Sequence, residues 1–224
     1  MKSDFATRFI AGSFLAAGVM FWVGWMLMPS HIGTFFEPED FSRVYSHFRL
    51  WIWMYRVHIF GMVISAVALI SFASVLVQHP GRVMVWPGVG VITAGTFVAA
   101  LAAAFYYHHG AWGALEMNGK SREEIQVFVA ALQVDTEYIT CLVRFGRVFF
   151  GLGLLILGLS ILKWAFVPKW TGAVAAILGL AAMAVTMLMP DQMSYYMPIF
   201  HLNPLWLAAM GIVVLRFGIR QSET

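Results

Sequence analysis

Long apolar runs separated by short polar segments make up most of the chain. The six longest runs cover residues 9–28, 57–77, 83–107, 143–166, 170–190 and 196–215. Each is close to the roughly 20 helical residues that cross the hydrocarbon core of a bilayer. Two runs contain one histidine each, His58 and His201, and one begins with Arg144 and Arg147, whose long side chains can extend to the membrane surface. The pattern predicts an all-α polytopic bundle of six transmembrane helices with both termini on one side.

The segments between these runs differ on the two sides of the expected membrane. On the side of the termini, the connections at 79–82 and 163–169 are short and contain proline. On the opposite side, which we call the loop side, residues 29–47 and 110–137 are longer and acidic. The loop side is therefore expected to carry most of the polar chemistry.

Helix-start signals lie within both long connections. Ser121 and Glu124 have the spacing of a capping box, in which each side chain can accept a hydrogen bond from the other residue's backbone N–H. Apolar residues at 125, 128 and 132 continue this helix toward the fourth span. Pro38, followed by two acidic residues, starts another helix in the same way. We expect the second and fourth spans to extend beyond the membrane.

The composition agrees with a protein that has lipid as its solvent. Hydrophobic residues make up 61% of the 224 residues and charged residues 11%, whereas soluble domains carry about 25% charged residues. A single cysteine excludes an intramolecular disulfide, and no basic run indicates a nucleic-acid partner. The first apolar run is too long for a signal peptide, so we expect it to be retained as a span.

The orientation of the bundle depends on a small difference in charge distribution. The 14 lysines and arginines divide into seven on each side of the expected membrane. Those on the side of the termini lie in short loops, where the positive-inside rule applies most strongly. We therefore expect the termini in the cytoplasm.

Histidines are concentrated on the loop side. The six that fall there are His31, His47, His58, His108, His109 and His201. Imidazole is a ligand for haem iron, zinc and copper. His58, His201 and either His108 or His109 are expected near the same end of three spans, where two could hold a haem or, with Glu116, a metal. The alternative is that they are interfacial residues hydrogen-bonded to neighbouring helices.

Three arginines lie where spans are expected to meet the loop side. Ionisable groups at membrane depth usually face the bundle interior and are paired or functional. Arg56, Arg144 and Arg147 could therefore donate hydrogen bonds to an anion, a lipid head group or a quinone. Alternatively, they extend to the membrane surface among the nearby tryptophans and tyrosines.

A possible internal repeat relates the two hairpins after the first span. Trp86 and Gly88, with Gly95 seven residues on, align with Trp170, Gly172 and Gly179. Parallel repeats of this kind occur in transporters. Chance similarity is the alternative, because glycine and tryptophan are frequent in this chain.

The stretch 149–179 resembles a family of bacterial six-helix integral membrane proteins of unknown function. The shared pattern is an FGLG run, a Pro-Lys-Trp turn and a glycine-bearing helix. The matching residues here are Phe150, Gly151, Gly153, Pro168, Lys169, Trp170 and Gly179. The resemblance covers under a third of the chain. It implies six helices and a bacterial inner membrane, and it implies no activity.

Three functions are compatible with these features. The first is a non-catalytic membrane component that docks other membrane subunits, or a second copy of itself, through the projecting helices. The second is a cytochrome b-like redox protein that binds quinone or haem, with haem b as the leading cofactor and His58 paired with His201 or His108. The third is a small-solute transporter, which the repeat would support. No catalytic set is evident, so an enzymatic role is not expected.

Overall fold

The computed structural model describes residues 5–26, 36–189 and 193–220, and every regular element in these ranges is a helix. The helices are α1 (Phe5–Met26), α2 (Pro38–Ser46), α3 (Phe48–Val75), α4 (Arg82–Met117), α5 (Arg122–Trp164), α6 (Lys169–Leu188) and α7 (Met193–Phe217). Six of them, all except α2, are long and apolar enough to cross a membrane. The predicted all-α bundle of six spans is confirmed. Residues 27, 28 and 190, at the ends of two predicted spans, lie outside the described ranges, as does His31.

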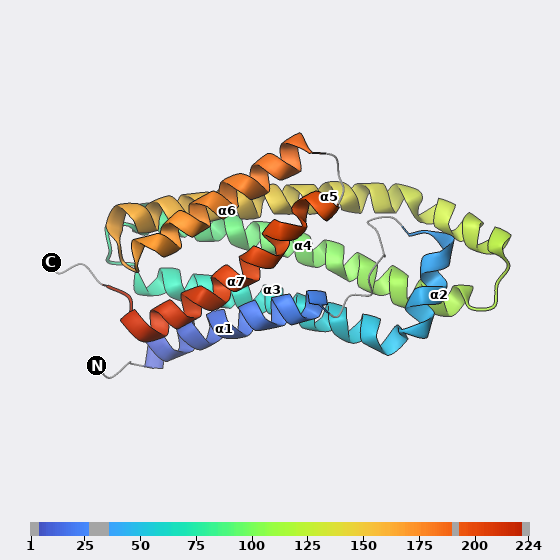
Figure 1. The fold of residues 1–224 in the computed structure, drawn as a ribbon, viewed down its shortest axis with the longest axis horizontal. Helices are drawn as coiled ribbons and strands as arrows, with labels where there is room; N and C mark the ends of the chain where they lie inside the picture. The colour runs from blue at the N-terminus through green and yellow to red at the C-terminus, as the bar shows by residue number, and fades with distance from the viewer. Residues whose placement is uncertain (1–4, 27–35, 190–192, 221–224) are drawn as a thin grey trace.

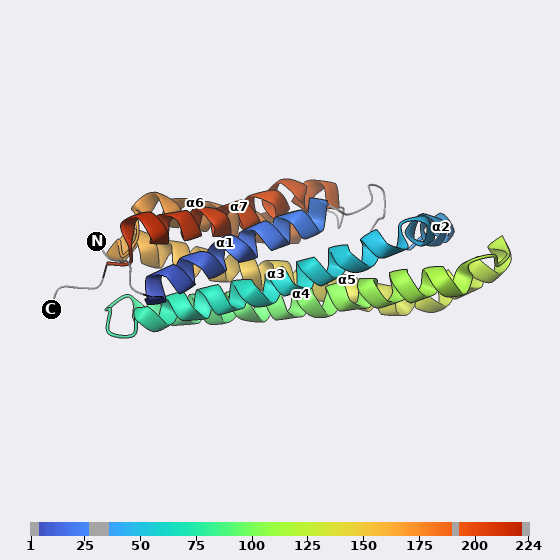
Figure 2. The same ribbon diagram turned by 90° about the horizontal axis from the view of Figure 1, so that it is seen from below.

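The six long helices form two layers of three. One layer contains α1, α7 and α6, and the other contains α3, α4 and α5 (Figure 2). Contacts run from α1 to α3, α4, α5, α6, α7 and back to α1, which closes a ring. Large apolar side chains such as Phe97, Ile177 and Ile212 are more than half exposed on the outside. This outer surface suits contact with the acyl chains of a bilayer.

Close contacts between helices depend on glycine at two faces of α5. A Cβ atom placed on Gly95 of α4 would lie 2.6 Å from the backbone nitrogen of Phe150. On the other face of α5, a Cβ atom on Gly158 would lie 2.6 Å from the carbonyl oxygen of Gly172 in α6. Small residues allow such backbone contact between membrane helices, where dispersion replaces the hydrophobic effect as the main attraction.

These glycines also account for the spacing that suggested a repeat. Gly88 and Gly95 of α4 pack against α5, and so do Gly172 and Gly179 of α6. In a parallel repeat, the glycines of α4 would instead face α3, as the glycines of α6 face α5. The shared seven-residue spacing therefore reflects two helices that pack against a common neighbour.

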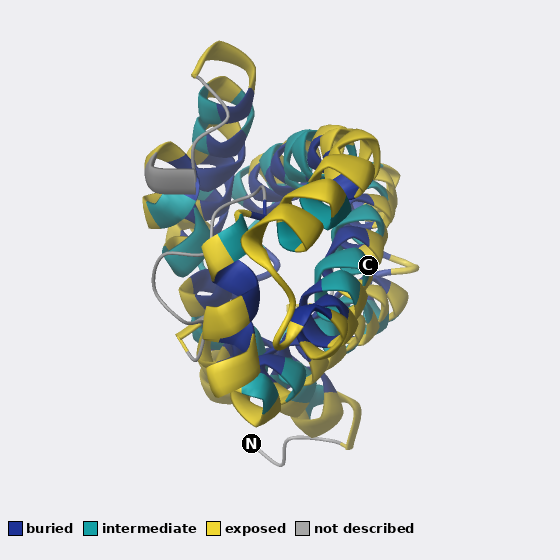
Figure 3. Cartoon of the chain, turned by 90° about the vertical axis from the view of Figure 1, so that its right-hand side faces the viewer, coloured by how far each residue is buried: buried dark blue, intermediate teal, exposed yellow. Residues whose placement is uncertain are grey.

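The half of the bundle near the chain termini is filled with large apolar side chains. Phe14, Phe72, Leu157, Phe166 and Met210 have no exposed surface and come from five different segments. In the end-on view, buried residues face the interior and exposed residues face outward (Figure 3). Apolar packing therefore fills the interior of the ring between these side chains.

Three helices, α3, α4 and α5, are longer than a bilayer crossing requires. At 1.5 Å per residue, the 36 residues of α4 and the 43 of α5 span about 54 and 65 Å, against a hydrocarbon core of about 30 Å. The predicted extension of α3 and α5 is confirmed. The third predicted span, 83–107, lies within α4, which continues as a helix to Met117.

Two glycines explain why α4 continues. A Cβ atom on Gly110 would lie 2.5 Å from the indole ring of Trp51, and one on Gly113 would lie 2.7 Å from the ring of Phe41. Both aromatic side chains are buried against α4. Aromatic packing at these two positions offsets the low helix propensity of glycine.

Helix α2 lies across the loop-side ends of the long helices (Figure 1). It contacts α3, α4 and α5, and its Phe41 and Val44 are buried among their side chains. We call α2 and the loop-side ends of these three helices the headpiece. Its apolar cluster is separate from the one near the termini.

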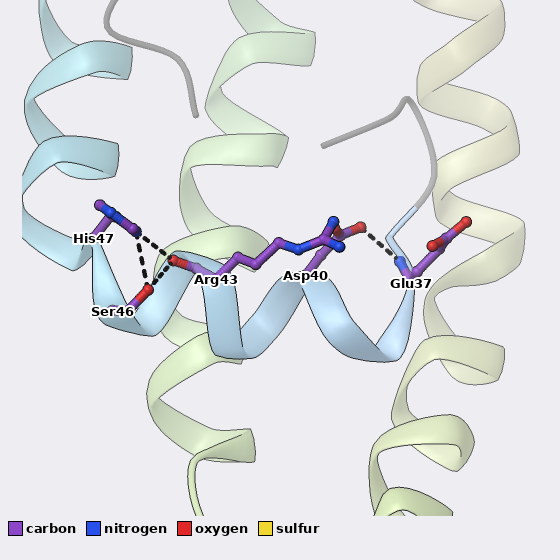
Figure 4. Close-up of polar contacts among 5 residues, drawn as sticks. All are labelled: Glu37, Asp40, Arg43, Ser46 and His47. Carbon is purple, nitrogen blue, oxygen red and sulfur yellow. Dashed lines mark hydrogen bonds and ion pairs between the residues drawn. The ribbon is translucent and has the colours of Figure 1, made fainter. Parts of the chain in front are cut away.

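Local hydrogen bonds fix both predicted helix starts. The Ser121 hydroxyl accepts from the backbone N–H of Glu124 at 3.2 Å, and the Glu124 carboxylate accepts from the backbone N–H of Ser121 at 2.8 Å. In α2, the Asp40 carboxylate accepts from the backbone N–H of Glu37 at 2.9 Å and from Arg43 at 3.3 Å (Figure 4). The predicted helix starts at Pro38 and after Ser121 are confirmed.

Candidate functional site

A cavity of about 180 Å³ lies between the two helix layers in the loop-side half of the bundle. Side chains from α1, α3, α4, α5 and α7 line it, and most of them are apolar. Its polar side chains are Tyr55, His58, Thr96, Tyr106, Arg147, Tyr196 and Asn203. A concave, mainly apolar pocket with a few converging polar groups is the usual form of a small-molecule site.

His58 enters the cavity from α3. Its Nδ1 lies 3.4 Å from the carbonyl oxygen of Phe21 in α1, and its ring packs against the rings of Phe21 at 4.5 Å and Phe200 at 5.8 Å. The helices can approach because α1 has glycine here: a Cβ on Gly24 would lie 2.9 Å from the backbone nitrogen of His58. A carbonyl oxygen only accepts, so this bond requires the hydrogen to be on Nδ1.

Arg147 of α5 and Tyr196 and Asn203 of α7 form a second polar group at the cavity. The guanidinium carbon of Arg147 lies 4.4 Å from the ring centre of Tyr196, which is a cation–π contact. Asn203 is hydrogen-bonded to Tyr196 through its side chain. The Asn203 Oδ1 atom is buried without a hydrogen-bond partner among the described residues. The amide nitrogen therefore makes the bond to Tyr196, and Oδ1 is enclosed by the surrounding protein.

The other two arginines have structural partners outside the cavity. Arg144 donates to the carbonyl oxygen of Thr186 at 2.7 Å, in the last turn of α6, where a cation also interacts favourably with the helix dipole. Arg56 is exposed, donates to the Tyr107 hydroxyl at 3.3 Å and lies over the Trp53 ring. Of the three candidate arginines, the structure brings only Arg147 into the cavity.

The remaining candidate histidines do not line the cavity with His58. His108 is exposed and His109 is partly buried, and their rings contact each other near Trp112 in the headpiece. His201 is partly buried in α7 and does not line the cavity. Among the described residues, no cluster of three or more His, Cys, Asp or Glu could hold a metal ion.

These positions do not fit the predicted haem site. Cofactor pockets usually have volumes of about 300–1,000 Å³, and this cavity is smaller. Only one of the four candidate histidines lines it, so it offers no histidine pair for axial ligation.

Sequence reasoning missed Asn203 and the tyrosines of the cavity. Asn203 follows His201 by two residues in a run interrupted by Pro198 and Pro204. A buried amide within an apolar span was the available signal, since polar groups in such spans usually have a partner or a function.

Comparison of the chain with protein-family models, with curated proteins and with solved structures finds no match in any of the three.

Proposed function

We propose that this protein is a non-catalytic integral membrane protein that binds a small, mainly apolar molecule in the cavity between its helix layers. The observation that carries the proposal is the cavity itself, whose mainly apolar wall brings together the polar side chains of His58, Arg147 and Asn203 from α3, α5 and α7. An apolar pocket with a few converging polar groups is the usual form of a small-molecule site.

The packing of the bundle near the termini supports ligand binding rather than transport of a solute. The half near the termini is packed with fully buried aromatic and aliphatic side chains, including Phe14, Phe72 and Phe166. A solute in the cavity would have to displace this packing to cross the membrane. The glycine spacing, which was the evidence for a transporter repeat, is explained by helix packing.

The test fills the cavity and asks whether a bound molecule is lost. Ala99 lines the cavity, whereas Ala104, on the same helix, is exposed on the outside. Small molecules extracted from purified wild type, Ala99→Leu and Ala104→Leu would be compared by mass spectrometry. We expect a stoichiometric molecule in wild type and Ala104→Leu that Ala99→Leu has lost. Equal amounts in all three, or none in any, would contradict the proposal.

A second candidate function is docking of another membrane subunit through the headpiece. Trp112, Leu115, Val127, Val134 and Tyr138 are between 48% and 74% exposed on helix segments that extend past the expected membrane surface. Exposed apolar groups of this kind can mark a protein interface. Proteins that remain bound during purification from native membranes would support docking, and a preparation free of other chains would exclude it.

A further inference from the structure

We propose that α5 pairs with α5 of a second copy of this chain through an apolar stripe on its exposed face. The residues of the stripe are all exposed, and alternating steps of four and three residues separate them: Val127, Ala131, Val134, Tyr138, Cys141 and Phe145. This is the spacing of the a and d positions of a heptad repeat. Such a spacing places a single seam along a helix, against which the seam of another helix packs in a coiled coil.

The stripe lies on the side of α5 that faces away from the bundle. Along the part of α5 that forms the headpiece, the buried residues Leu132, Thr136 and Thr140 lie on the opposite face of the helix. Val127 and Val134 of the stripe are 70% and 74% exposed. A single copy of the chain therefore leaves this seam uncovered.

The position of α6 indicates how much of the stripe lies outside the hydrocarbon core. The 20 residues of α6 span about 30 Å, which is the thickness of the core. The last turn of α6 lies beside Arg144 of α5, which donates to the carbonyl oxygen of Thr186 at 2.7 Å. Helix α5 continues well past this end of α6 (Figure 1), and Val127 lies about 25 Å further along it at 1.5 Å per residue. Most of the stripe therefore faces water.

Water and lipid have different consequences for exposed apolar side chains. Acyl chains are as apolar as the side chains themselves, so Phe145, at the membrane end of the stripe, gains little from a protein partner. In water, the hydrophobic effect favours the burial of Val127, Val134 and Tyr138. The part of the stripe that projects past α6 is therefore the part that drives pairing.

A second copy of the chain supplies the helix that the stripe requires. The partner helix must project about 25 Å from the same membrane surface and carry a matching seam, and α5 of another copy does both. Two copies inserted in the same orientation are related by a two-fold axis along the membrane normal. Their α5 helices are then parallel, and each stripe residue lies at the same height as its counterpart.

The charges beside the stripe are compatible with this parallel pairing. In a parallel coiled coil, residues at the e and g positions flank the seam and face those of the other helix. Glu137, at a g position, lies beside Leu142 of the second copy, and Asp135, at an e position, lies beside Ala130 of the second copy. Two carboxylates therefore do not face each other along the stripe.

Cysteine cross-linking tests the pairing in native membranes. Cys141 is the single cysteine of the chain and lies in the stripe, and a disulfide requires Cα atoms about 4.4–6.8 Å apart. Copper phenanthroline should give a product of twice the mass of the chain, which reductant reverses. With Cys141→Ser as background, Val134→Cys should also cross-link. Gln133→Cys, which is exposed beside the stripe, should react at least about tenfold more slowly. Equal rates at 133 and 134, no product, or a product that contains another protein would overturn the proposal.

A matched pair of charge substitutions tests the energetics of the seam. Val134→Glu places two carboxylates against each other across the two-fold axis and should raise the Kd of self-association at least about tenfold. Gln133→Glu adds the same charge outside the stripe and should leave the Kd unchanged. Both side chains are exposed in a single copy, so both variants should fold. Light scattering of the purified proteins in detergent would measure the Kd, and equal values for the two variants would contradict the proposal.

This pairing is independent of the molecule proposed for the cavity. Val143, Arg147 and Phe150, which α5 contributes to the cavity, lie on the face of the helix opposite the stripe. Val134→Glu should therefore retain the same molecule as wild type in the extraction experiment. A chain that retains the molecule but does not self-associate would refute the pairing alone, and a self-associating chain without the molecule would refute the proposed function alone.

Discussion

Asp40 is an acidic residue that folding removes almost completely from water. It is 1% exposed, and its carboxylate holds the first turn of α2 through Glu37 and Arg43. Burial raises the pKa of this carboxyl above 3.8, and the Glu37 backbone N–H and Arg43 counteract part of the rise. The charged form is therefore less favourable in the folded headpiece than in the unfolded chain.

The sign of this effect gives a pH prediction for Asp40→Asn. The folded chain binds a proton at Asp40 more readily than the unfolded chain does. The resulting stability is present below pH 3.8 and is lost as pH rises through the raised pKa. Asparagine is neutral throughout, so the variant lacks this dependence. Hydrogen exchange of the α2 amides would be measured in both proteins at each pH. The ratio of the wild-type protection factor to that of the variant should fall as pH rises. A ratio that stays constant or rises would contradict the prediction.

Arg144 and Arg147 show which residue properties the sequence could predict. Both were predicted as arginines at a span end, and they differ by less than one helical turn. Arg144 reaches the last turn of α6, while Arg147 reaches Tyr196 in α7. That difference depends on the positions of α6 and α7 around α5. The sequence pattern of α5 alone does not give those positions. The same limit applies to His58 and His201, since each needed the position of a partner helix to be interpreted.

Helix existence followed from the apolar runs, and helix ends depended on contacts. The six spans, the start of α2 and the capping box at Ser121 were all predicted from local pattern. The ten further residues of α4 after 107 were not predicted, because Gly110 and Gly113 are helix-weakening residues until Trp51 and Phe41 pack against them. Only the tertiary contacts of these glycines account for the length of α4.

Helix α4 offers a matched test of glycine-mediated packing. A Cβ atom on Gly95 would lie within 2.7 Å of the backbone of α5, whereas Gly90 has open space at the same position. Gly95→Ala should therefore lower the free energy of unfolding by about 1–3 kcal/mol. Gly90→Ala should leave it unchanged or raise it by up to about 1 kcal/mol, because alanine is the better helix former. Unfolding in mixed detergent would measure both, and equal effects of the two substitutions would contradict the packing account.

The two halves of the bundle differ in how their interior is filled. The half near the termini holds a packed apolar core, the other half holds the cavity, and the headpiece lies beyond the cavity. The sequence predicted which end carries the polar chemistry, since His58 and Arg147 are both on the loop side. Which end faces the cytoplasm stays a prediction, because the lysines and arginines divide seven to seven between the two sides.

A crystal structure of the protein purified directly from its native membrane tests the central claim most directly. The account predicts electron density from a non-protein molecule in the cavity, in contact with the aromatic and polar side chains that line it. A cavity closed by side chains, or one that holds ordered water alone, would contradict the account.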